Sequence, residues 1–361
     1  MATAKKASPP RGAKRINLAL QGGGSHGALT WGALDRLLED PRLQIADVSG
    51  TSAGAMNAVV LADGYMRGGP EGARTALRNF WKAVSDAARF SPIQRSWWDR
   101  LLGNYSLDYS PGYLMSESLS RIFSPYDINP LGLNPLRDLL LEQVDFSNVN
   151  ACPQIRVHVT ATNVRSGAAK IFSRGAVTAD AVLASACLPQ MYAAVEIDGE
   201  AYWDGGFSGN PALFPLVESK ASPDILIIQI NPVIRQEIPR QAREIINRVN
   251  EISFNSSLIK ELRTIKLTQR LLARENIGED RKEYRIYLHL IHADAEVQDL
   301  AASSKLNAEW EYLQLLFERG RRWADTWLAE NFDQIGVAST LDLDEFFNEP
   351  PRSNGLLGRR R

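Results

Sequence analysis

Ser52 stands at the centre of the pentapeptide Gly50-Thr51-Ser52-Ala53-Gly54, and this G-x-S-x-G pattern could make its hydroxyl a nucleophile. In this pattern a sharp strand-to-helix turn lifts the serine above a sheet, and the flanking glycines leave room for the turn. The run IADVS before the motif and the alanine-rich run after it predict such a strand and helix. The helix dipole would then point its positive end at the reacting atoms.

Three consecutive glycines, Gly22, Gly23 and Gly24, follow the apolar run INLAL and precede a helical pattern. Bare backbone N–H groups in such a turn can come close to an anion. If Ser52 attacks a carbonyl group, that anion is the tetrahedral oxyanion, for which each preorganised donor is worth roughly 3–4 kcal/mol. We therefore interpret Gly22–Gly24 as an oxyanion hole on a strand end next to that of Ser52.

The glycines also fit the dinucleotide-binding pattern G-x-G-x-x-G, with Gly27 as its last member. Asp47 follows Gly27 by twenty residues, where that pattern places a ribose-binding carboxylate. A ribose-binding acid belongs at the end of the second strand, however, and GTSAG occupies that end. A nucleotide- or lipid-binding module with a structural Ser52 is the non-catalytic alternative.

A nucleophilic serine needs a general base, and Asp204 is one candidate. Gly205 and Gly206 follow it, so the backbone can turn sharply and present the carboxylate at a strand end. A Ser-His-Asp esterase that uses His292 or His289 is the alternative, since Ser52, Asp204 and His292 follow its chain order. Ser52 comes very early in the chain for that fold.

Taken in order, the segments QGGGSHG, GTSAG and DGG resemble the motifs of the patatin-like phospholipase family. The segments TATNVRSG (Thr160–Gly167) and ASACLPQMY (Ala184–Tyr192) resemble further parts of that family, and the likeness extends over about residues 16–215. The resemblance implies a three-layer α/β/α fold and a Ser–Asp dyad without a catalytic histidine. It makes Ser52 the nucleophile, Asp204 the base and Gly22–Gly24 the oxyanion donors, with a lipid ester as substrate and no cofactor or metal.

His26 departs from the family's pattern, in which Lys or Arg often precedes the last glycine of the first motif. A basic side chain there would help to polarise the glycine loop, and a neutral imidazole would do so less well. The alternative is an ordinary histidine on a helix surface. Six residues are expected to support the motifs rather than to react: His26, Gly27, Gly50, Gly54, Gly205 and Gly206.

The elements that must position these residues alternate between apolar strands and helical patterns, which predicts an α/β protein with a mainly parallel central sheet. Strands are expected at 16–20, 44–50, 155–164, 224–230 and 285–293, and a closing helix in the C-terminal part at 305–332. We divide the chain into a basic disordered tail (1–15), a catalytic domain (16–335) and a C-terminal tail (336–361). Residues 90–135, rich in Trp, Tyr and Pro, are expected to be an aromatic insertion or lid.

The composition limits the classes of partner. The formal net charge is −1, which argues against a nucleic-acid partner. The cysteines Cys152 and Cys187 are too few for a disulfide framework, and no apolar run is long enough for a membrane span. The basic N-terminus lacks the apolar core of a secretion signal, so we expect a cytoplasmic protein. Peripheral membrane contact and the oligomeric state stay open.

Overall fold

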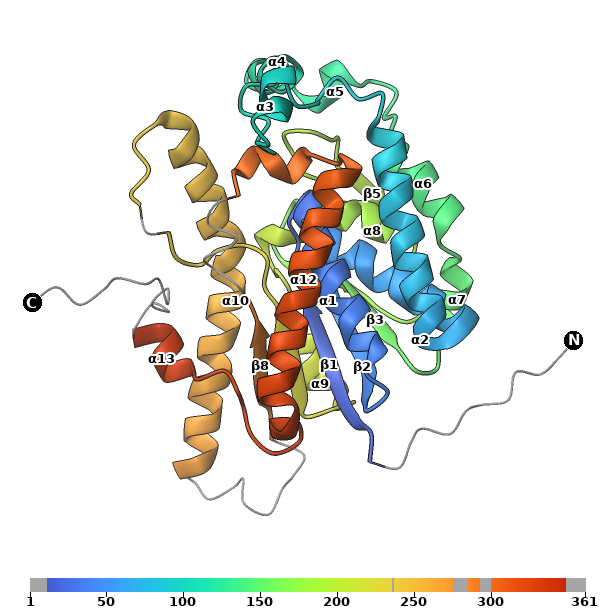
Figure 1. Cartoon of the computed structure of the whole chain (residues 1–361), viewed down its shortest axis with the longest axis vertical. Helices are drawn as coiled ribbons and strands as arrows, with labels where there is room; N and C mark the ends of the chain where they lie inside the picture. The colour runs from blue at the N-terminus through green and yellow to red at the C-terminus, as the bar shows by residue number, and fades with distance from the viewer. Residues whose placement is uncertain (1–11, 236, 275–284, 293–299, 349–361) are drawn as a thin grey trace, which may run out of the picture.

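The computed structural model describes residues 12–235, 237–274, 285–292 and 300–348 (Figure 1). The strands are β1 (Lys14–Leu20), β2 (Leu43–Thr51), β3 (Arg156–Asn163), β4 (Ala169–Phe172), β5 (Val195–Ile197), β6 (Glu200–Asp204), β7 (Asp224–Ile228) and β8 (Tyr287–Ile291). The long helices are α1 (Gly27–Glu39), α2 (Ala53–Ala88), α10 (Ala242–Arg274) and α12 (Trp310–Asn331). The shorter ones are α3 (Trp97–Leu101), α4 (Pro111–Ser120), α5 (Pro125–Ile128), α6 (Pro135–Gln143), α7 (Phe146–Ala151), α8 (Ala179–Ser185), α9 (Phe214–Ser219) and α13 (Leu343–Asn348).

One sheet contains these strands in the order β5-β6-β3-β2-β1-β7-β8, with β4 paired to β3. The pairs β3–β2, β2–β1, β1–β7 and β7–β8 are parallel, whereas β4, β5 and β6 pair antiparallel at one side. The predicted mainly parallel sheet is confirmed. Because the carboxyl ends of parallel strands meet at one edge, the segments after β1 and β2 lie side by side there.

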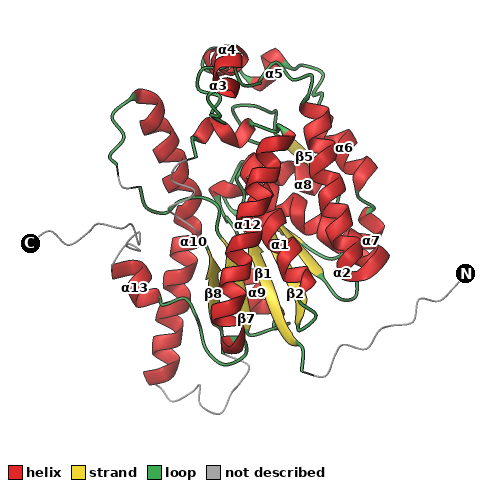
Figure 2. Cartoon of the chain, in the orientation of Figure 1, coloured by secondary structure: helices red, strands yellow, loops and turns green. Residues whose placement is uncertain are grey.

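Helices cover both faces of the sheet, which confirms the three-layer α/β/α architecture (Figure 2). Successive residues of β1 show how the sequence builds it. Leu18 and Leu20 join the core beneath α1, α2 and α12, whereas Ala19 joins a second core formed with α9, α10 and α13. Side chains alternate between faces along a strand, so a continuous apolar run is what a sheet buried on both sides requires.

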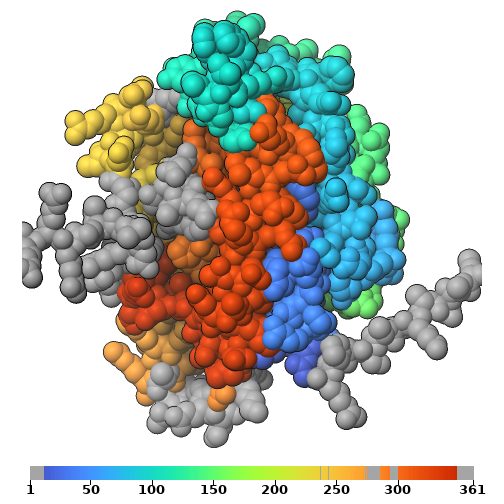
Figure 3. Space-filling view, in the orientation of Figure 1, coloured from blue at the N-terminus to red at the C-terminus, as the bar shows by residue number. Residues whose placement is uncertain are grey.

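Residues 90–135 form a cap, named here by that range, at the top of the molecule (Figures 1 and 3). The serines Ser96, Ser110 and Ser124 cap its short helices α3, α4 and α5 by accepting backbone N–H bonds. Neither α4 nor α5 contains a buried residue. The cap therefore rests on the remainder of the molecule through loop contacts, such as Leu107 N–H to Ser303 Oγ at 3.0 Å.

The predicted domain limits need two corrections. The first strand begins at Lys14 instead of residue 16, and residues 1–11 of the predicted tail lie outside the described residues. The stretch from 336 to 348 is not a free tail, because Leu341 N–H bonds Leu288 O at 3.0 Å and Leu343 is buried in the second core. Its apolar residues at helical spacing in α13 pack against α10, and residues 349–361 lie outside the described residues.

Candidate active site

Ser52 lies between β2 and α2 in a backbone conformation that L-residues rarely adopt, with φ 54° and ψ −121°. Such strain persists only where the surroundings fix it. The Ser52 N–H donates to the buried Ser185 Oγ at 2.8 Å, and a Cβ on Gly54 would lie 2.2 Å from Leu20 O. A Cβ on Gly50 would likewise lie 2.5 Å from Gly54 O. Both glycines of the predicted motif are thus needed for the turn that half-exposes Ser52.

Strand register brings Asp204 to Ser52. Thr51 pairs with Thr160 on β3, and the next residue of β3, Ala161, pairs with Asp204 on β6. The backbone of Asp204 is fixed on both sides, since its N–H donates to Cys187 O at 2.8 Å and its carbonyl accepts from the Thr162 hydroxyl at 2.8 Å.

The Gly205–Gly206 pair shapes the turn after Asp204. A Cβ on Gly205 would lie 2.1 Å from Thr160 O, so only glycine fits against that strand. The N–H of Gly206 donates to Asp204 Oδ1 at 2.7 Å and holds the carboxylate in place. The D-G-G segment therefore presents a fixed carboxylate at a strand end, as its sequence predicted.

Burial dominates the electrostatics of Asp204. The residue is 2% exposed, and burial raises its pKa from 3.8 to about 7. The Gly206 N–H bond and the nearby Ser52 hydroxyl lower that pKa in part. The pKa of the neighbouring thiol of Cys187 is raised to about 12 by burial and by the Asp204 charge, so it stays neutral. A carboxyl that titrates near neutral pH suits proton transfer from a hydroxyl.

The glycine loop lies against Ser52, since a Cβ on Gly22 would be 2.8 Å from Ser52 Cβ. The loop's three N–H groups are not equivalent. The N–H of Gly22 donates to Asn210 Oδ1 at 2.7 Å, so it is engaged and differs from the predicted free donor. Gly23 is half-buried and Gly24 is exposed with φ 59°, and no hydrogen bond within the described residues uses the N–H of Gly23.

His26 is buried, unlike the surface histidine that the sequence left open. Its Nε2 lies 2.9 Å from Ser304 Oγ, and the Ser304 hydroxyl itself donates to Ala301 O. Nε2 is therefore the protonated nitrogen in this network. Burial, Lys305 and Arg235 place the pKa of His26 well below its ordinary value, so the ring is neutral. His26 packs η4 (Ala302–Leu306) onto the loop, while Gly27 lets α1 approach Ala53.

The histidines of the alternative triad lie elsewhere. β1 and β7 separate β2 from β8, so three strand spacings of about 4.8 Å lie between Ser52 and His292, which follows β8. His289 is fully buried and lies 3.0 Å from Asp224 Oδ1 and 2.9 Å from Thr340 Oγ1. Neither reaches Ser52.

A second serine–histidine pair exists away from this edge. Ser173 Oγ lies 2.7 Å from His158 Nδ1, and His158 Nε2 lies 3.4 Å from Asp47 Oδ2. Asp47 is thus engaged within the sheet instead of at a ribose-binding strand end. No glycine loop or turn like that at Ser52 is described beside Ser173, which makes it a useful control serine.

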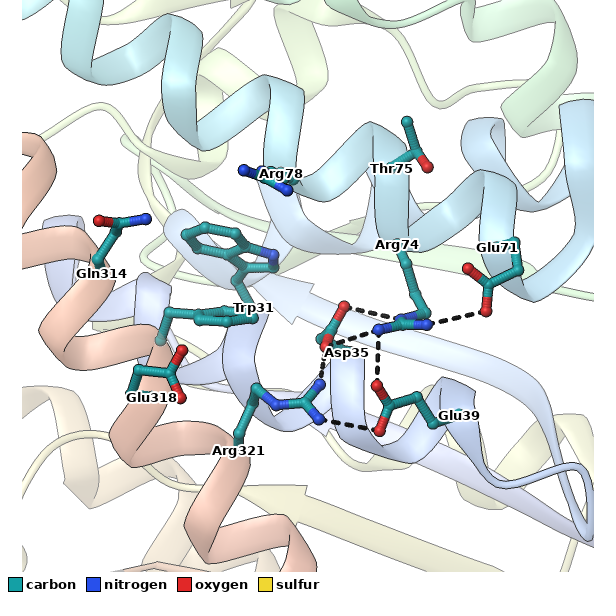
Figure 4. Close-up of a pocket in the computed structure, with 11 residues that line it drawn as sticks. Trp31, Asp35, Glu39, Glu71, Arg74, Thr75, Arg78, Gln314, Glu318 and Arg321 are labelled. Carbon is teal, nitrogen blue, oxygen red and sulfur yellow. Dashed lines mark hydrogen bonds and ion pairs between the residues drawn. The ribbon is translucent and has the colours of Figure 1, made fainter.

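A depression on another face is lined by α1, α2 and α12 (Figure 4). Arg74 bonds Asp35 at 2.8 Å and Glu39 at 2.6 Å, and Arg321 bonds the same two carboxylates. These charges satisfy one another and clamp three helices together. Within the described ranges, no three His, Cys, Asp or Glu side chains gather as a metal site, and no helix is both long and apolar enough to span a bilayer.

Sequence reasoning missed the amides and the lysine that hold the glycine loop. Asn231 Nδ2 donates to Gly22 O at 2.6 Å, and Lys305 Nζ donates to Asn231 Oδ1 at 2.7 Å. Asn210 lies four residues after the D-G-G segment, and this closeness was a weak indication in the sequence that it belongs to the site. Lys305 comes from a part of the chain without any recognisable motif, so only the fold reveals it.

The chain is similar to several solved structures. VipD from Legionella pneumophila is 14% identical to this chain. The match covers 88% of this chain and 67% of VipD, with a TM-score of 0.37. A structure of the type III effector protein ExoU is 14% identical, with coverages of 90% and 54% and a TM-score of 0.34. ExoU from Pseudomonas aeruginosa in complex with SpcU is also 14% identical. The match covers 89% of this chain and 53% of ExoU, with a TM-score of 0.32. The chain thus spans about half the length of ExoU, and likeness at these TM-scores carries no functional argument.

No curated protein matches the chain. A family profile does, because residues 18–217, more than half of the chain, match the patatin-like phospholipases. The matched range contains the glycine loop, Ser52 and Asp204. The chain belongs to the patatin-like phospholipase family.

Proposed function

We propose that the protein is a serine lipid acyl hydrolase of the phospholipase A, lysophospholipase or acylglycerol lipase type, with Ser52 and Asp204 as a dyad. The observation that carries the proposal is the strained Ser52 at a strand–helix turn beside a buried carboxyl of raised pKa. Membership of a family of phospholipases supports lipid esters as the substrate class.

In the acylation step, ionised Asp204 accepts the proton of the Ser52 hydroxyl while Oγ attacks the ester carbonyl carbon. The carbonyl oxygen becomes an oxyanion. Because the Gly22 N–H is engaged by Asn210, we assign the stabilising donors to Gly23 and Gly24. Collapse of the intermediate breaks the ester bond, and protonated Asp204 returns the proton to the leaving alcohol.

In the deacylation step, a water molecule takes the place of the alcohol. Asp204 accepts a proton from the water, whose oxygen attacks the acyl-enzyme carbonyl. The second tetrahedral intermediate forms at the same donors. Its collapse releases the fatty acid, and the proton on Asp204 returns to Ser52 Oγ.

Aromatic side chains beside the dyad suit an acyl chain. A Cβ on Gly206 would lie 3.2 Å from the ring of Phe254, which meets Phe207 edge-to-face at 5.0 Å between centroids. Phe207 is 38% exposed, so part of this apolar wall is free. Such a wall both accepts apolar substrate and keeps water from Asp204, which maintains its raised pKa.

The cap is the candidate contact with a lipid aggregate. Its exposed large apolar side chains include Trp97, Trp98, Leu101 and Leu102, each more than half exposed. The cap carries three arginines against four carboxylates, so apolar insertion and not attraction to anionic headgroups would drive contact. This supports a role at the lipid–water boundary over the alternative of a passive insertion.

The test is hydrolysis of a phosphatidylcholine, a lysophosphatidylcholine and a monoacylglycerol by the wild type and by Ser52→Ala. We expect the variant to lose at least about 10³-fold in kcat. Ser173→Ala, which removes the serine that is bonded to His158, is expected to keep full activity. A double change of His289 and His292 to Gln is expected to leave most of the activity.

Two outcomes would overturn the proposal. Hydrolysis that is lost in Ser52→Ala and equally lost in the histidine double change would favour the Ser-His-Asp esterase. Binding of a lipid or nucleotide that Ser52→Ala leaves unchanged, with no hydrolysis of any ester by the wild type, would favour the non-catalytic module.

A further inference from the structure

We propose that Lys305 is a positioning residue of the oxyanion hole, which it polarises through Asn231 and the Gly22–Gly23 peptide. This inference rests on the proposed function, since it assigns a task to the same site. It gives a role to the C-terminal part of the chain, in which no motif for chemistry is present.

The relay consists of two short hydrogen bonds. Lys305 Nζ donates to Asn231 Oδ1 at 2.7 Å, and Asn231 Nδ2 donates to Gly22 O at 2.6 Å. The Asn231 backbone is fixed as well, because its N–H donates to Gln21 Oε1 at 2.8 Å. An ammonium charge is therefore connected to one carbonyl of the glycine loop through a single amide side chain.

The peptide group explains why this matters for catalysis. The Gly22 carbonyl and the Gly23 N–H belong to the same peptide unit, so withdrawing electron density at the oxygen makes that N–H a stronger donor. The Gly22 N–H is held by Asn210 and cannot serve. The polarised peptide thus joins Gly22, which lies against Ser52, to the N–H of Gly23, which is half-buried and unengaged within the described residues.

Lys305 is fixed against the loop by its own backbone. A Cβ on Gly24 would lie 2.4 Å from Lys305 O, so only glycine allows η4 to pack this closely. The preceding residue, Ser304, lies 2.9 Å from His26 Nε2. The relay therefore joins two parts of the chain that are already locked together.

The surrounding charges argue against a simple ion pair. The carboxylate of Glu251 on α10 acts on Lys305 as a counter-charge, but Arg235 and Arg248 bond its two oxygens at 2.6 and 3.2 Å. Within the described part of the chain, the hydrogen bond of the Lys305 ammonium goes to an amide instead of a carboxylate. Burial and Arg235 lower the pKa of Lys305, Glu251 raises it, and the facing His26 is neutral. Removing part of the half-exposed ammonium group from water with a neutral amide as its hydrogen-bond partner costs free energy, so packing alone does not explain Lys305 at this position.

The kinetic test compares Lys305→Met, which removes donor and charge, with Lys305→Gln, which keeps a donor. Charge-assisted hydrogen bonds are roughly twice as strong as neutral ones. We therefore expect kcat to fall about tenfold in the Lys305→Met variant and by less in the Lys305→Gln variant. KM should change less than about twofold. The wild type should lose activity at high pH as Lys305 deprotonates, at a pH below the one usual for lysine. This fall in the pH–rate profile should be absent from both variants. Lys266→Met, a matched change on α10, should keep wild-type kcat.

A second readout does not need turnover. In the Ser52→Ala background, the Gly23 amide proton should resonate downfield of its position in Ser52→Ala/Lys305→Met, with Gly336 as an unaffected reference. An unmoved Gly23 amide overturns the relay whether or not the enzyme hydrolyses esters. A moved amide with wild-type kcat in Lys305→Met overturns the catalytic role. A wild type that hydrolyses no ester overturns the proposed function and, with it, the catalytic role of Lys305. A lower kcat in Lys305→Met together with a shifted Gly23 amide supports both the relay and its catalytic role.

Discussion

Replacing Asp204 by asparagine should stabilise the protein increasingly as the pH rises, while it removes activity. Asparagine keeps an oxygen that can accept the Gly206 N–H, so the turn is retained. What disappears is a carboxyl that titrates near 7 in the fold and near 3.8 when unfolded. The folded state binds the proton more tightly than the unfolded state. Each unit by which the pH rises between these two values therefore lowers the free energy of unfolding of the wild type.

The magnitude follows from the same two pKa values. Each pKa unit corresponds to about 1.36 kcal/mol, so the ionised carboxylate costs the fold about 4 kcal/mol at high pH. About 2 kcal/mol of this is already present near pH 5, since the unfolded chain is ionised there. The advantage of Asp204→Asn over the wild type should therefore grow by about 2–3 kcal/mol between about pH 5 and pH 8. Any constant effect of the new amide cancels in this difference.

The assay is urea unfolding of both proteins at several pH values across that range. Asp40→Asn is a matched control, because Arg42 holds the pKa of Asp40 below its usual range and its titration ends before the range begins. Its difference from the wild type should stay flat. A flat or falling difference for Asp204→Asn would refute the raised pKa and, with it, the argument that Asp204 is tuned as a base.

Three further predictions follow from the same geometry. Hydrolysis should rise with pH through about 7, because only ionised Asp204 accepts the serine proton; a rate that is flat down to about pH 4 would contradict this. Gly54→Ala should lower the free energy of unfolding by about 3 kcal/mol, since its Cβ would lie 2.2 Å from Leu20 O, whereas Gly68→Ala, with nothing within 4 Å, should change it little; equal effects in urea would contradict the packing argument. Changing Trp98, Leu101 and Leu102 to Ser should reduce turnover of micellar lipid far more than that of a short soluble ester, and equal losses would exclude the cap from lipid contact.

The sequence was sufficient to predict the α/β architecture and the strand ends that carry Ser52 and Asp204. Continuous apolar runs such as DILIIQI mark strands buried on both faces, and the structure confirms that strand as β7. The dipeptide Asp198-Gly199 is typical of a tight hairpin turn, and both residues adopt positive φ between β5 and β6. These features depend on neighbours in the chain, and sequence patterns report such neighbours well.

Other features depend on contacts between distant residues, which no local pattern reports. The burial of His26 arises from η4, some 280 residues later, and the engagement of the Gly22 N–H arises from Asn210. Residues 336–348 looked like a tail because α13 is only six residues long and its partner, α10, lies far away in sequence. Lys305 has no signal at all until the fold brings it to Asn231.

The most direct test of the central claim is covalent labelling by a fluorophosphonate, followed by intact-mass measurement, for the wild type, Ser52→Ala and Asp204→Asn. This reagent reports an activated serine without a choice of lipid. We predict one adduct on the wild type, none on Ser52→Ala, and none on Asp204→Asn over the same time, with detergent micelles present to open access past the cap. Equal labelling of Ser52→Ala, or a wild type that stays unlabelled with and without micelles, would contradict the assignment of Ser52 as a nucleophile activated by Asp204.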